Sequence, residues 1–294
     1  MENEQVYLVT LKNILENGEI CSDRTGVGTK SMFGIKMDFD LVAGFPLLTT
    51  KKVLWRYALH ELLWMIRGDT NTKHLEDVGV HYWKANTSRD FLDKRGLEWE
   101  EGDMGPGYGF QWRHWGTSYT GCQIDYTGCG FDQLTELVHG IQNDPHGRRH
   151  ILTSWNCEDI SKMALPPCHL LAQFHVSGDK QFIDCMLLQR SGDMFLGVPF
   201  NMIMYAMLTH MIGYITGLIP RKLVHVIGDA HIYLNHMDAV GIQLSRSPKI
   251  PPRFQIDIQN DDHRNVKSID DFIFSDFNVT GYDPQPFIPA KMAV

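Results

Sequence analysis

Cys168 has the sequence context of a catalytic nucleophile. It follows the dipeptide Pro166-Pro167 and precedes His169 and an apolar stretch. Proline fixes the backbone dihedral φ, so the two prolines hold the chain, and with it the sulfur, rigidly at this point. A thiolate held in this way can attack an electrophilic carbon. A buried cysteine is, however, also a common small hydrophobic residue of protein cores, and both interpretations remain open here.

Several arginines have the surroundings of an anion-binding site. Arg24 lies in a glycine-containing turn, and Arg190 is followed by Ser191 at the end of an apolar stretch. Arginine, a hydroxyl group and backbone amides together suit a phosphate, although each arginine alone could equally form a surface ion pair. Arg148 and Arg149 are adjacent, and neighbouring residues of a strand point to opposite faces. Both reach one anion only if the backbone is irregular there or one of them reaches across a subunit interface.

Glu61 lies within a segment that is predicted to be a helix from residue 53 to residue 67 and to end at Gly68. The segment is apolar nearly all round. The side chains three and four residues from Glu61 are Tyr57, Ala58, Trp64 and Met65. A carboxylate among such neighbours either turns to solvent or is buried with a function. Burial would raise its pKa toward the range in which it exchanges protons at neutral pH.

Two strands and a connecting turn are predicted around the candidate nucleophile and arginines. The ranges 170–176 and 181–189 are strand-like, and Ser177-Gly178-Asp179-Lys180 between them is typical of a hairpin turn. A third strand is predicted over 148–155. Helices and strands mix without regular strand–helix–strand alternation, which favours an α+β fold over a doubly wound parallel sheet. The range 83–126 is predicted to be a long functional loop region.

One stretch, residues 194–220, carries no charged side chain and is long enough to span a bilayer. It also contains Pro199 and the polar residues Thr209 and His210, and no second span accompanies it. We therefore expect a helix over 202–215 in the core of a large globular protein. Asn201 is predicted to cap its start and Gly217 to end it.

The composition limits the classes of function. The net charge is −8, and a domain that holds duplex nucleic acid should be basic. Six cysteines in 294 residues are too sparse for a disulfide scaffold, and without a Cys-x-x-Cys motif no metal site is expected. No P-loop or Gly-x-Gly-x-x-Gly motif suggests ATP or NAD. The polar N-terminus lacks a secretory signal, so a cytoplasmic location is expected, together with the nucleus for a eukaryotic source.

The motifs taken together resemble the thymidylate synthase family, nearly from end to end. The segments that carry the resemblance are Asp23–Thr29, Met163–His169, Gln189–Asn201, Gly228–His236 and Met292–Val294. The segments 85–93 and 109–114 look most like eukaryotic and viral members. The resemblance implies one catalytic domain over residues 1–294, an α+β fold with a mixed or antiparallel sheet packed with helices. It also implies a homodimer joined sheet to sheet, with dUMP and folate as small-molecule ligands.

The resemblance implies reductive methylation of dUMP at C5 to dTMP. The carbon donor and reductant would be 5,10-methylenetetrahydrofolate, a co-substrate that leaves as dihydrofolate, with no metal. Uracil C5 is a poor nucleophile, and a thiolate that adds at C6 turns C5 into an enolate carbon able to attack the methylene group. Cys168 matches that thiolate, and positive surroundings would help it form.

The resemblance also implies residues that bind the nucleotide. Those that would hold the phosphate are Arg24, Arg190 and Ser191, with Arg148 and Arg149 from the partner subunit. Asn201 would read the base by accepting from N3–H and donating to O4, and relatives that act on dCMP carry Asp there. Gln189 would orient the nucleotide. His231 and Tyr233 would bond the ribose 3′-hydroxyl.

The remaining implied roles concern proton transfer and the folate. Glu61 would organise a water network near O4 and the folate N5, Tyr108 would position the water that removes the C5 proton, and His169 would support the network. Asp193 matches the pterin-binding acid. Residues expected to line the folate pocket are Trp83, Asn86, Leu196, Gly197, Phe200 and Ala293. Lys51 would attract the glutamate tail or be merely solvated. His114, His210, His225 and His236 are expected to be structural or surface residues.

The chain departs from the family pattern at several positions, none of which has an assigned chemical role. They are Tyr82, Lys84, Gly107, Met186, Leu188, Ile203, Met204 and the pair Arg221-Lys222. At residue 82 the usual residue is Ile, and Tyr82 and Lys84 border the expected folate pocket. These changes leave two alternatives open. One is a dUMP hydroxymethylase of the same fold, in which water completes the reaction, and the other is a catalytically inactive nucleotide- or folate-binding relative.

Overall fold

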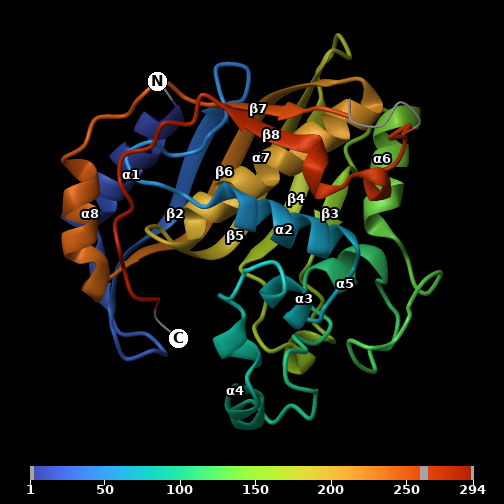
Figure 1. Ribbon diagram of the computed structural model, residues 1–294, viewed down its shortest axis with the longest axis horizontal. Coiled ribbons are helices and arrows are strands. Elements are labelled where there is room, and N and C mark those ends of the chain that lie inside the picture. Colours follow the sequence, from blue (N-terminus) through green and yellow to red (C-terminus); the bar gives the residue numbers. More distant parts are fainter. Residues whose placement is uncertain (1–2, 259–263, 293–294) are drawn as a thin grey trace.

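The computed structural model describes residues 3–258 and 264–292, which form a mixed sheet packed against helices (Figure 1). The strands of the main sheet, in spatial order, are β1 (Glu19–Cys21), β2 (Thr29–Asp40), β6 (Ile219–Tyr233), β5 (Phe182–Asp193), β4 (His169–Val176) and β3 (Ile151–Thr153). Neighbouring strands are antiparallel except β5 and β6, which are parallel. A separate antiparallel pair consists of β7 (Arg253–Ile256) and β8 (Phe277–Thr280). The predicted α+β class with a mixed sheet is confirmed.

Helix α7 packs on β5 and β6 of this sheet, and α2 packs on α7 (Figure 1). The helices of the described chain are α1 (Asn3–Asn17), α2 (Trp55–Ile66), α3 (Lys73–Glu76), α4 (Arg89–Lys94), α5 (Gly109–Arg113), α6 (Gln133–Asn143), α7 (Gly197–Thr216) and α8 (Met237–Leu244). Its 3-10 turns are η1 (Lys84–Thr87), η2 (Ile160–Lys162), η3 (Leu234–His236), η4 (Ile269–Asp271) and η5 (Phe274–Asp276). The main hydrophobic core joins the sheet to α1, α2 and α7.

The predicted hairpin is confirmed, because β4 and β5 pair across the turn 177–180. The predicted third strand was too long. Only residues 151–153 pair with β4, and Arg148 and Arg149 lie in the turn before them. The predicted loop region over 83–126 was also partly wrong, because it contains η1, α4 and α5. Local capping explains α4, since the Ser88 hydroxyl accepts a hydrogen bond from a backbone amide of its first turn.

Helix α7 begins earlier than predicted, and Asn201 is not its cap. The helix starts at Gly197, with Pro199 in the first turn, where a missing N–H costs nothing. Asn201 instead lies inside the helix and contacts β5 through its side chain. Gly217 ends the helix in the left-handed conformation, with φ of 73°, as predicted. Within the described residues α7 alone is apolar and long enough to cross a membrane, and 72% of its most apolar stretch is buried.

The second face of the sheet carries apolar side chains that are partly open to solvent in the single chain. The register places Leu171, Leu188 and Val226 side by side across β4, β5 and β6, and Met186 beside Val224. Met186 is 37% exposed and Leu188 is 38% exposed.

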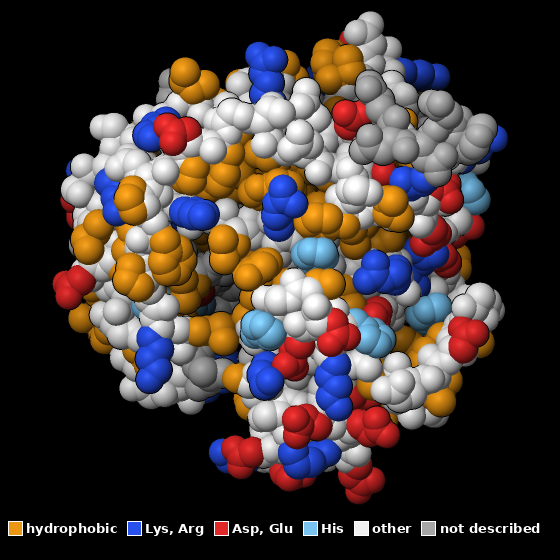
Figure 2. Space-filling model, viewed as in Figure 1, with side chains coloured by type: hydrophobic (Ala, Val, Ile, Leu, Met, Phe, Trp, Pro, Cys, Tyr) orange, Lys and Arg blue, Asp and Glu red, His pale blue; other side chains and the backbone are white. Residues whose placement is uncertain are grey.

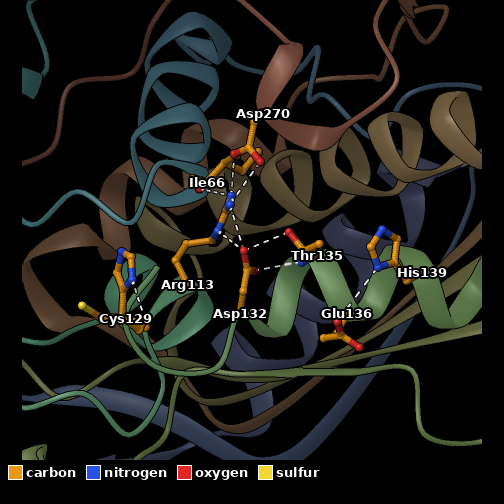
Figure 3. A network of polar contacts seen from close by, with 9 residues as sticks. Ile66, Arg113, Cys129, Asp132, Thr135, Glu136, His139 and Asp270 are labelled. Carbon is orange, nitrogen blue, oxygen red and sulfur yellow. Dashed lines mark hydrogen bonds and ion pairs between the residues drawn. The ribbon is translucent and has the colours of Figure 1, made fainter. Parts of the chain in front are cut away.

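Arg113, whose contacts are drawn in Figure 3, connects the ends of α2 and α6 with η4. Helix α2 carries the expected site residue Glu61, and Arg113 itself lies in α5, which begins beside Tyr108. Its guanidinium donates to the carbonyl of Ile66 at the end of α2 (2.8 Å). It also forms ion pairs with Asp132, the N-cap of α6 (3.0 Å), and with Asp270 of η4 (2.6 Å).

Close backbone packing reinforces this connection at Gly109, the first residue of α5. A Cβ atom at Gly109 would lie 2.3 Å from the carbonyl oxygen of Met65 in α2, so only glycine permits this approach. Glu61 and Tyr108 are therefore held in a fixed relation by backbone contact as well as by the Arg113 network.

Candidate active site

Cys168 lies where the chain enters β4, and neighbouring groups fix it from two sides. Its backbone amide donates to the Tyr108 hydroxyl (2.8 Å), and its carbonyl accepts from the amide of Arg190 (2.8 Å). The Arg190 guanidinium donates to the carbonyls of Pro167 (2.8 Å) and Pro166 (2.9 Å) and lies 3.7 Å from the Cys168 sulfur. The two prolines therefore position the arginine as well as the sulfur.

Cys168 is half-buried, and desolvation of its thiol raises the pKa above the ordinary value. The positive charges of Arg190 and then Arg24 oppose this effect, as does a hydrogen bond with Tyr108. The arginines therefore favour the thiolate as expected, but in the single chain desolvation outweighs them. Because both arginines act on the sulfur, both guanidinium groups lie in its neighbourhood.

Arg24 is presented by a tight turn between β1 and β2. The Asp23 carboxylate accepts from the amide and hydroxyl of Thr25 and from the amide of Gly28 (2.7 Å), which closes the turn. Gly26 and Gly28 adopt left-handed conformations, with φ of 72° and 81°. The exposed Arg24 side chain thus projects from a rigid loop at the sheet end that also carries Cys168 and Arg190.

Arg148 and Arg149 are not part of this cluster within one chain. Ile151 pairs with Gln173, so the same register puts Arg149 level with His175 of β4, which pairs with Asp184 of β5. Arg190 lies about six residues, or about 20 Å, further along β5. Both arginines are exposed, in the segment between α6 and β3. The structure therefore separates them from the phosphate-binding candidates of the same subunit.

Three polar side chains form a hydrogen-bonded line that ends at the expected base-reading residue. His225 Nε2 donates to Gln189 Oε1 (2.8 Å), and Gln189 Nε2 donates to Asn201 Oδ1 (3.0 Å) and to the Ser191 carbonyl (2.9 Å). Burial lowers the pKa of His225 to about 3, so the imidazole is neutral. This line sets the orientation of the Asn201 amide.

His225 is fully buried, so the alternative that it lies on the surface was wrong. An alternating pattern in the sequence indicates the burial of His225. Leu223, His225 and Ile227 alternate along β6 and all face the core.

His231 and Tyr233 share one face of β6, with ring centroids 5.1 Å apart. The register pairs Asp193 with His231 and Ser191 with Asp229 across the parallel β5–β6 pair. The expected ribose-binding residues therefore lie beside the strand end that carries the phosphate-binding and pterin-binding candidates.

Glu61 is buried, so the alternative that it turns to solvent was wrong. Oε2 accepts from the Tyr82 hydroxyl (2.7 Å) and Oε1 accepts from Trp83 Nε1 (2.6 Å). Burial raises the pKa of Glu61, and the hydrogen bonds from Trp83 and Tyr82 lower it. The result is a desolvated carboxylate with fixed geometry, which suits repeated proton exchange.

His169 supports Tyr108 rather than contributing charge. Its Nδ1 is 2.8 Å from the Tyr205 hydroxyl, and its ring centroid is 4.3 Å from that of Tyr108. Burial, followed by the proximity of His225, lowers the pKa of His169 to about 3. Tyr205 was not predicted, although it lies one helical turn after Asn201 on the same face of α7.

The expected folate residues gather around the start of α7. Leu196, Gly197 and Phe200 lie at or in its first turn, and the Asp193 carboxylate accepts from the amides of Phe195 (2.9 Å) and Leu196 (3.1 Å). Figure 2 shows the face in view hollowed beside this region, between the C-terminal segment and α3 and α4.

Trp83 and Asn86 complete the group from η1, and the Asn86 amide nitrogen is buried without a hydrogen-bond partner in the described chain. A buried donor of this kind fits a polar atom of a bound ligand. Ala293 lies outside the described residues.

Lys51 is not solvated, so that alternative was wrong. It is 5% exposed, its ammonium group donates to the Phe195 carbonyl, and it lies 3.5 Å from the centroid of the Phe195 ring. Desolvation lowers the pKa of Lys51 to about 7, although the charge of Asp193 opposes the change.

His236 is also buried rather than exposed. It donates through Nε2 to the Lys291 carbonyl (2.8 Å) and lies 3.8 Å from Asp193.

Comparisons with known proteins point to one family. A family model described as thymidylate synthase matches residues 5–294. Thymidylate synthase of equine herpesvirus 2 is 52% identical over 292 residues, covering 99% of this chain and 98% of that protein. Human thymidylate synthase is 50% identical, covering 99% of this chain and 91% of that protein. A bifunctional dihydrofolate reductase-thymidylate synthase of Arabidopsis thaliana is 49% identical over 99% of this chain, which spans 55% of that longer protein.

Proposed function

The chain belongs to the thymidylate synthase family, and from this premise we propose how its own residues carry out the reaction. The enzyme methylates dUMP at C5 to give dTMP, with 5,10-methylenetetrahydrofolate as the co-substrate. The observation that carries the assignment of residues is the position of the Cys168 sulfur. It lies 3.7 Å from the Arg190 guanidinium, in a segment that Tyr108 holds in place.

Cys168 is the nucleophile. Its sulfur forms a bond to C6 of dUMP, and the electron pair of the C5–C6 double bond becomes available at C5, which attacks the methylene carbon. The C5 proton is then removed as the bond between the methylene carbon and N5 of the folate breaks, which releases tetrahydrofolate and leaves an exocyclic methylene group on C5. A hydride from this tetrahydrofolate converts the methylene group to methyl and leaves dihydrofolate. The bond between sulfur and C6 breaks last, restoring the double bond and freeing Cys168. Arg190 and Arg24 favour the thiolate at the start of this cycle.

Proton transfer at the base and the folate depends on three residues, Glu61, Tyr108 and His169. Glu61 is desolvated and hydrogen-bonded at both oxygens, so it can organise water near O4 of the base and N5 of the folate. Tyr108 positions the water that accepts the C5 proton, and the neutral His169 packs against its ring. The Asn86 amide and the Asp193 carboxylate, with Trp83, Leu196, Gly197 and Phe200, hold the folate. Lys51 is buried against Phe195, two residues after Asp193.

The phosphate site is shared between two subunits. Arg24, Arg190 and Ser191 supply one side, and Arg148 and Arg149 of a second copy supply the other, because about 20 Å separates them from Arg190 in their own subunit. The partly open apolar row on the second face of the sheet gives the second copy a surface to cover. We infer a homodimer joined through these sheet faces.

One assay tests the function. The enzyme is supplied with dUMP tritiated at C5 and with methylenetetrahydrofolate, and the release of tritium and the formation of dihydrofolate are followed together. A synthase gives both in equal amounts, which is the expected result. Tritium release without dihydrofolate would identify a hydroxymethylase, and neither product would identify a binding protein. Each of the latter outcomes contradicts the proposal.

Substitution of Asn201 tests how the base is read. In Asn201→Asp the side chain can no longer donate to O4 of uracil, while a carboxylate can accept from the amino group of cytosine. We expect kcat/KM for dUMP to fall about 100-fold, since one buried polar contact is lost, and turnover of dCMP to become measurable. Asn17→Asp, the same change at an exposed position of α1, is the control and should leave both values unchanged. An unaltered preference for dUMP in Asn201→Asp would show that another residue selects the base.

A further inference from the structure

Two aromatic side chains, Trp83 and Tyr82, hold the Glu61 carboxylate. Trp83 Nε1 donates to Oε1 (2.6 Å), and the Tyr82 hydroxyl donates to Oε2 (2.7 Å). Residue 82 is one of the positions at which the sequence departs from the family pattern, where Ile is usual. Since an Ile side chain carries no donor, the second contact depends on the tyrosine of this chain.

We propose that Tyr82 is a positioning residue that sets the orientation of the Glu61 carboxylate and stabilises its ionised form. The inference rests on the proposed role of Glu61 in proton transfer. With Trp83 as the only donor, the carboxylate could rotate and leave one oxygen unbonded in a desolvated site. With a donor at each oxygen, the carboxylate plane is set and both oxygens are satisfied.

The two donors differ in what they do when Glu61 takes up a proton. The indole N–H of Trp83 can only donate, so Oε1 stays an acceptor in both protonation states. The Tyr82 hydroxyl can donate or accept, so it can turn and accept a hydrogen bond from a protonated Oε2. Tyr82 therefore directs the proton of Glu61 to one oxygen and keeps a partner for that oxygen in both states.

The hydrogen bonds from Trp83 and Tyr82 are the main interactions that favour the ionised form of Glu61. Desolvation is the largest influence on its pKa, and the bonds from Trp83 and Tyr82 oppose it. The titratable groups near Glu61 are Tyr108 at the start of α5 and Tyr205 of α7, and His169 of β4 contacts both of these tyrosines. The other charged or titratable groups on α2 itself are Arg56, Tyr57 and His60, with Arg67 at its end. Burial first, and the charge of Glu61 among the smaller causes, raise the pKa of Tyr108 and of Tyr205, so these phenols stay neutral where Glu61 titrates. Removal of one donor should therefore be visible in the titration of Glu61.

The ring of Tyr82 has a separate packing role. It makes an edge contact with the ring of Phe200, at a centroid distance of 6.0 Å, in the group of expected folate residues. Replacement by Phe keeps this ring and removes only the hydroxyl, so the two roles can be separated by experiment.

The test compares wild type with Tyr82→Phe, using the full-length enzyme. The Glu61 carboxyl is followed by carbon-13 NMR titration with dUMP bound, and its signal is assigned by its loss in Glu61→Gln. We expect the pKa of Glu61 in Tyr82→Phe to rise by about one to two pH units, as loss of a hydrogen bond to a charged group predicts. The limb of the kcat profile that reports Glu61 should move to higher pH, and kcat should fall about 10-fold. KM for methylenetetrahydrofolate should change by less than about two-fold, because the ring contact with Phe200 remains.

Tyr57→Phe is the matched control, because Tyr57 lies on α2 and its hydroxyl makes no hydrogen bond within the described chain. It should titrate and react as the wild type does. Tyr82→Ile is the second variant, and the pKa of Glu61 should rise in it as in Tyr82→Phe. An unchanged Glu61 titration and kcat in both Tyr82 variants would overturn the inference while leaving the proposed function intact. Full activity of Glu61→Gln would instead remove Glu61 from the mechanism, and the role of Tyr82 with it.

Discussion

Cys168→Ala is expected to lose both tritium release and dihydrofolate formation, by about 10⁴-fold or more, because no covalent bond to C6 can form. Without that bond C5 does not become nucleophilic, and no other side chain at the site replaces the sulfur. The Arg190 guanidinium, held by the carbonyls of Pro166 and Pro167, remains in place in this variant. We therefore expect dUMP to bind with an affinity within about ten-fold of wild type.

Calorimetric titration with dUMP and the tritium assay together check this prediction. Cys157→Ala is the control, since Cys157 is exposed and makes no contact with the candidate site residues. It should keep full activity. Tritium release by Cys168→Ala at more than about one hundredth of the wild-type rate would show that another group activates C5.

Subunits that are inactive alone are expected to restore activity when mixed, if Arg148 and Arg149 serve the partner's site. The double variant Arg148→Glu with Arg149→Glu should lose at least about 100-fold in kcat/KM, because two cations that hold the phosphate become anions. Mixed in equal amounts with Cys168→Ala and allowed to exchange subunits, it should recover about a quarter of wild-type activity. Half of the dimers are then mixed, and each has one complete site.

A mixture with Arg190→Ala is the matched control for that recovery. Arg190 lies 3.7 Å from Cys168 in the same chain, so mixing Arg190→Ala with Cys168→Ala creates no complete site. This mixture should show no more than the mean activity of its two parents. Recovery in the control, or none in the mixture that carries the Arg148 and Arg149 substitutions, would contradict the shared site. Sedimentation of each mixture establishes that dimers have formed.

The features that the sequence predicted correctly depend on short-range signals. The hairpin between β4 and β5 depends on the turn residues 177–180, and the end of α7 depends on Gly217, whose left-handed conformation needs no partner. The start of α7 was misplaced because the Asn201 side chain contacts Gln189 of β5 rather than a backbone amide of its own first turn. From the sequence alone, an asparagine that caps a helix cannot be distinguished from one whose amide contacts a neighbouring strand, as that of Asn201 does.

The candidate site could likewise be predicted only in part from the sequence. The resemblance indicated which residues should act, but not their partners or their protonation. Lys51 has a charged side chain, and only the carbonyl and ring of Phe195, brought from the far end of β5, explain its burial. The sequence assigns Tyr82 no role, because its partner Glu61 lies on α2, 21 residues earlier in the chain than the turn residue Tyr82. These contacts depend on packing between distant segments, which no local pattern contains.

The parallel pairing of β5 and β6 has a consequence for how the enzyme folds. Parallel neighbours require a crossover, and α7 provides it, so His231 reaches Asp193 only after this helix has docked. The turn that carries Arg24 is placed by a contact of still longer range. It precedes β2, and β2 pairs with β6, about 190 residues further along the chain. The nucleotide site is therefore assembled by the slowest class of contacts, those of high contact order. Bound dUMP should accordingly stabilise only the completely folded chain, and protection from proteolysis by dUMP would report the last step of folding.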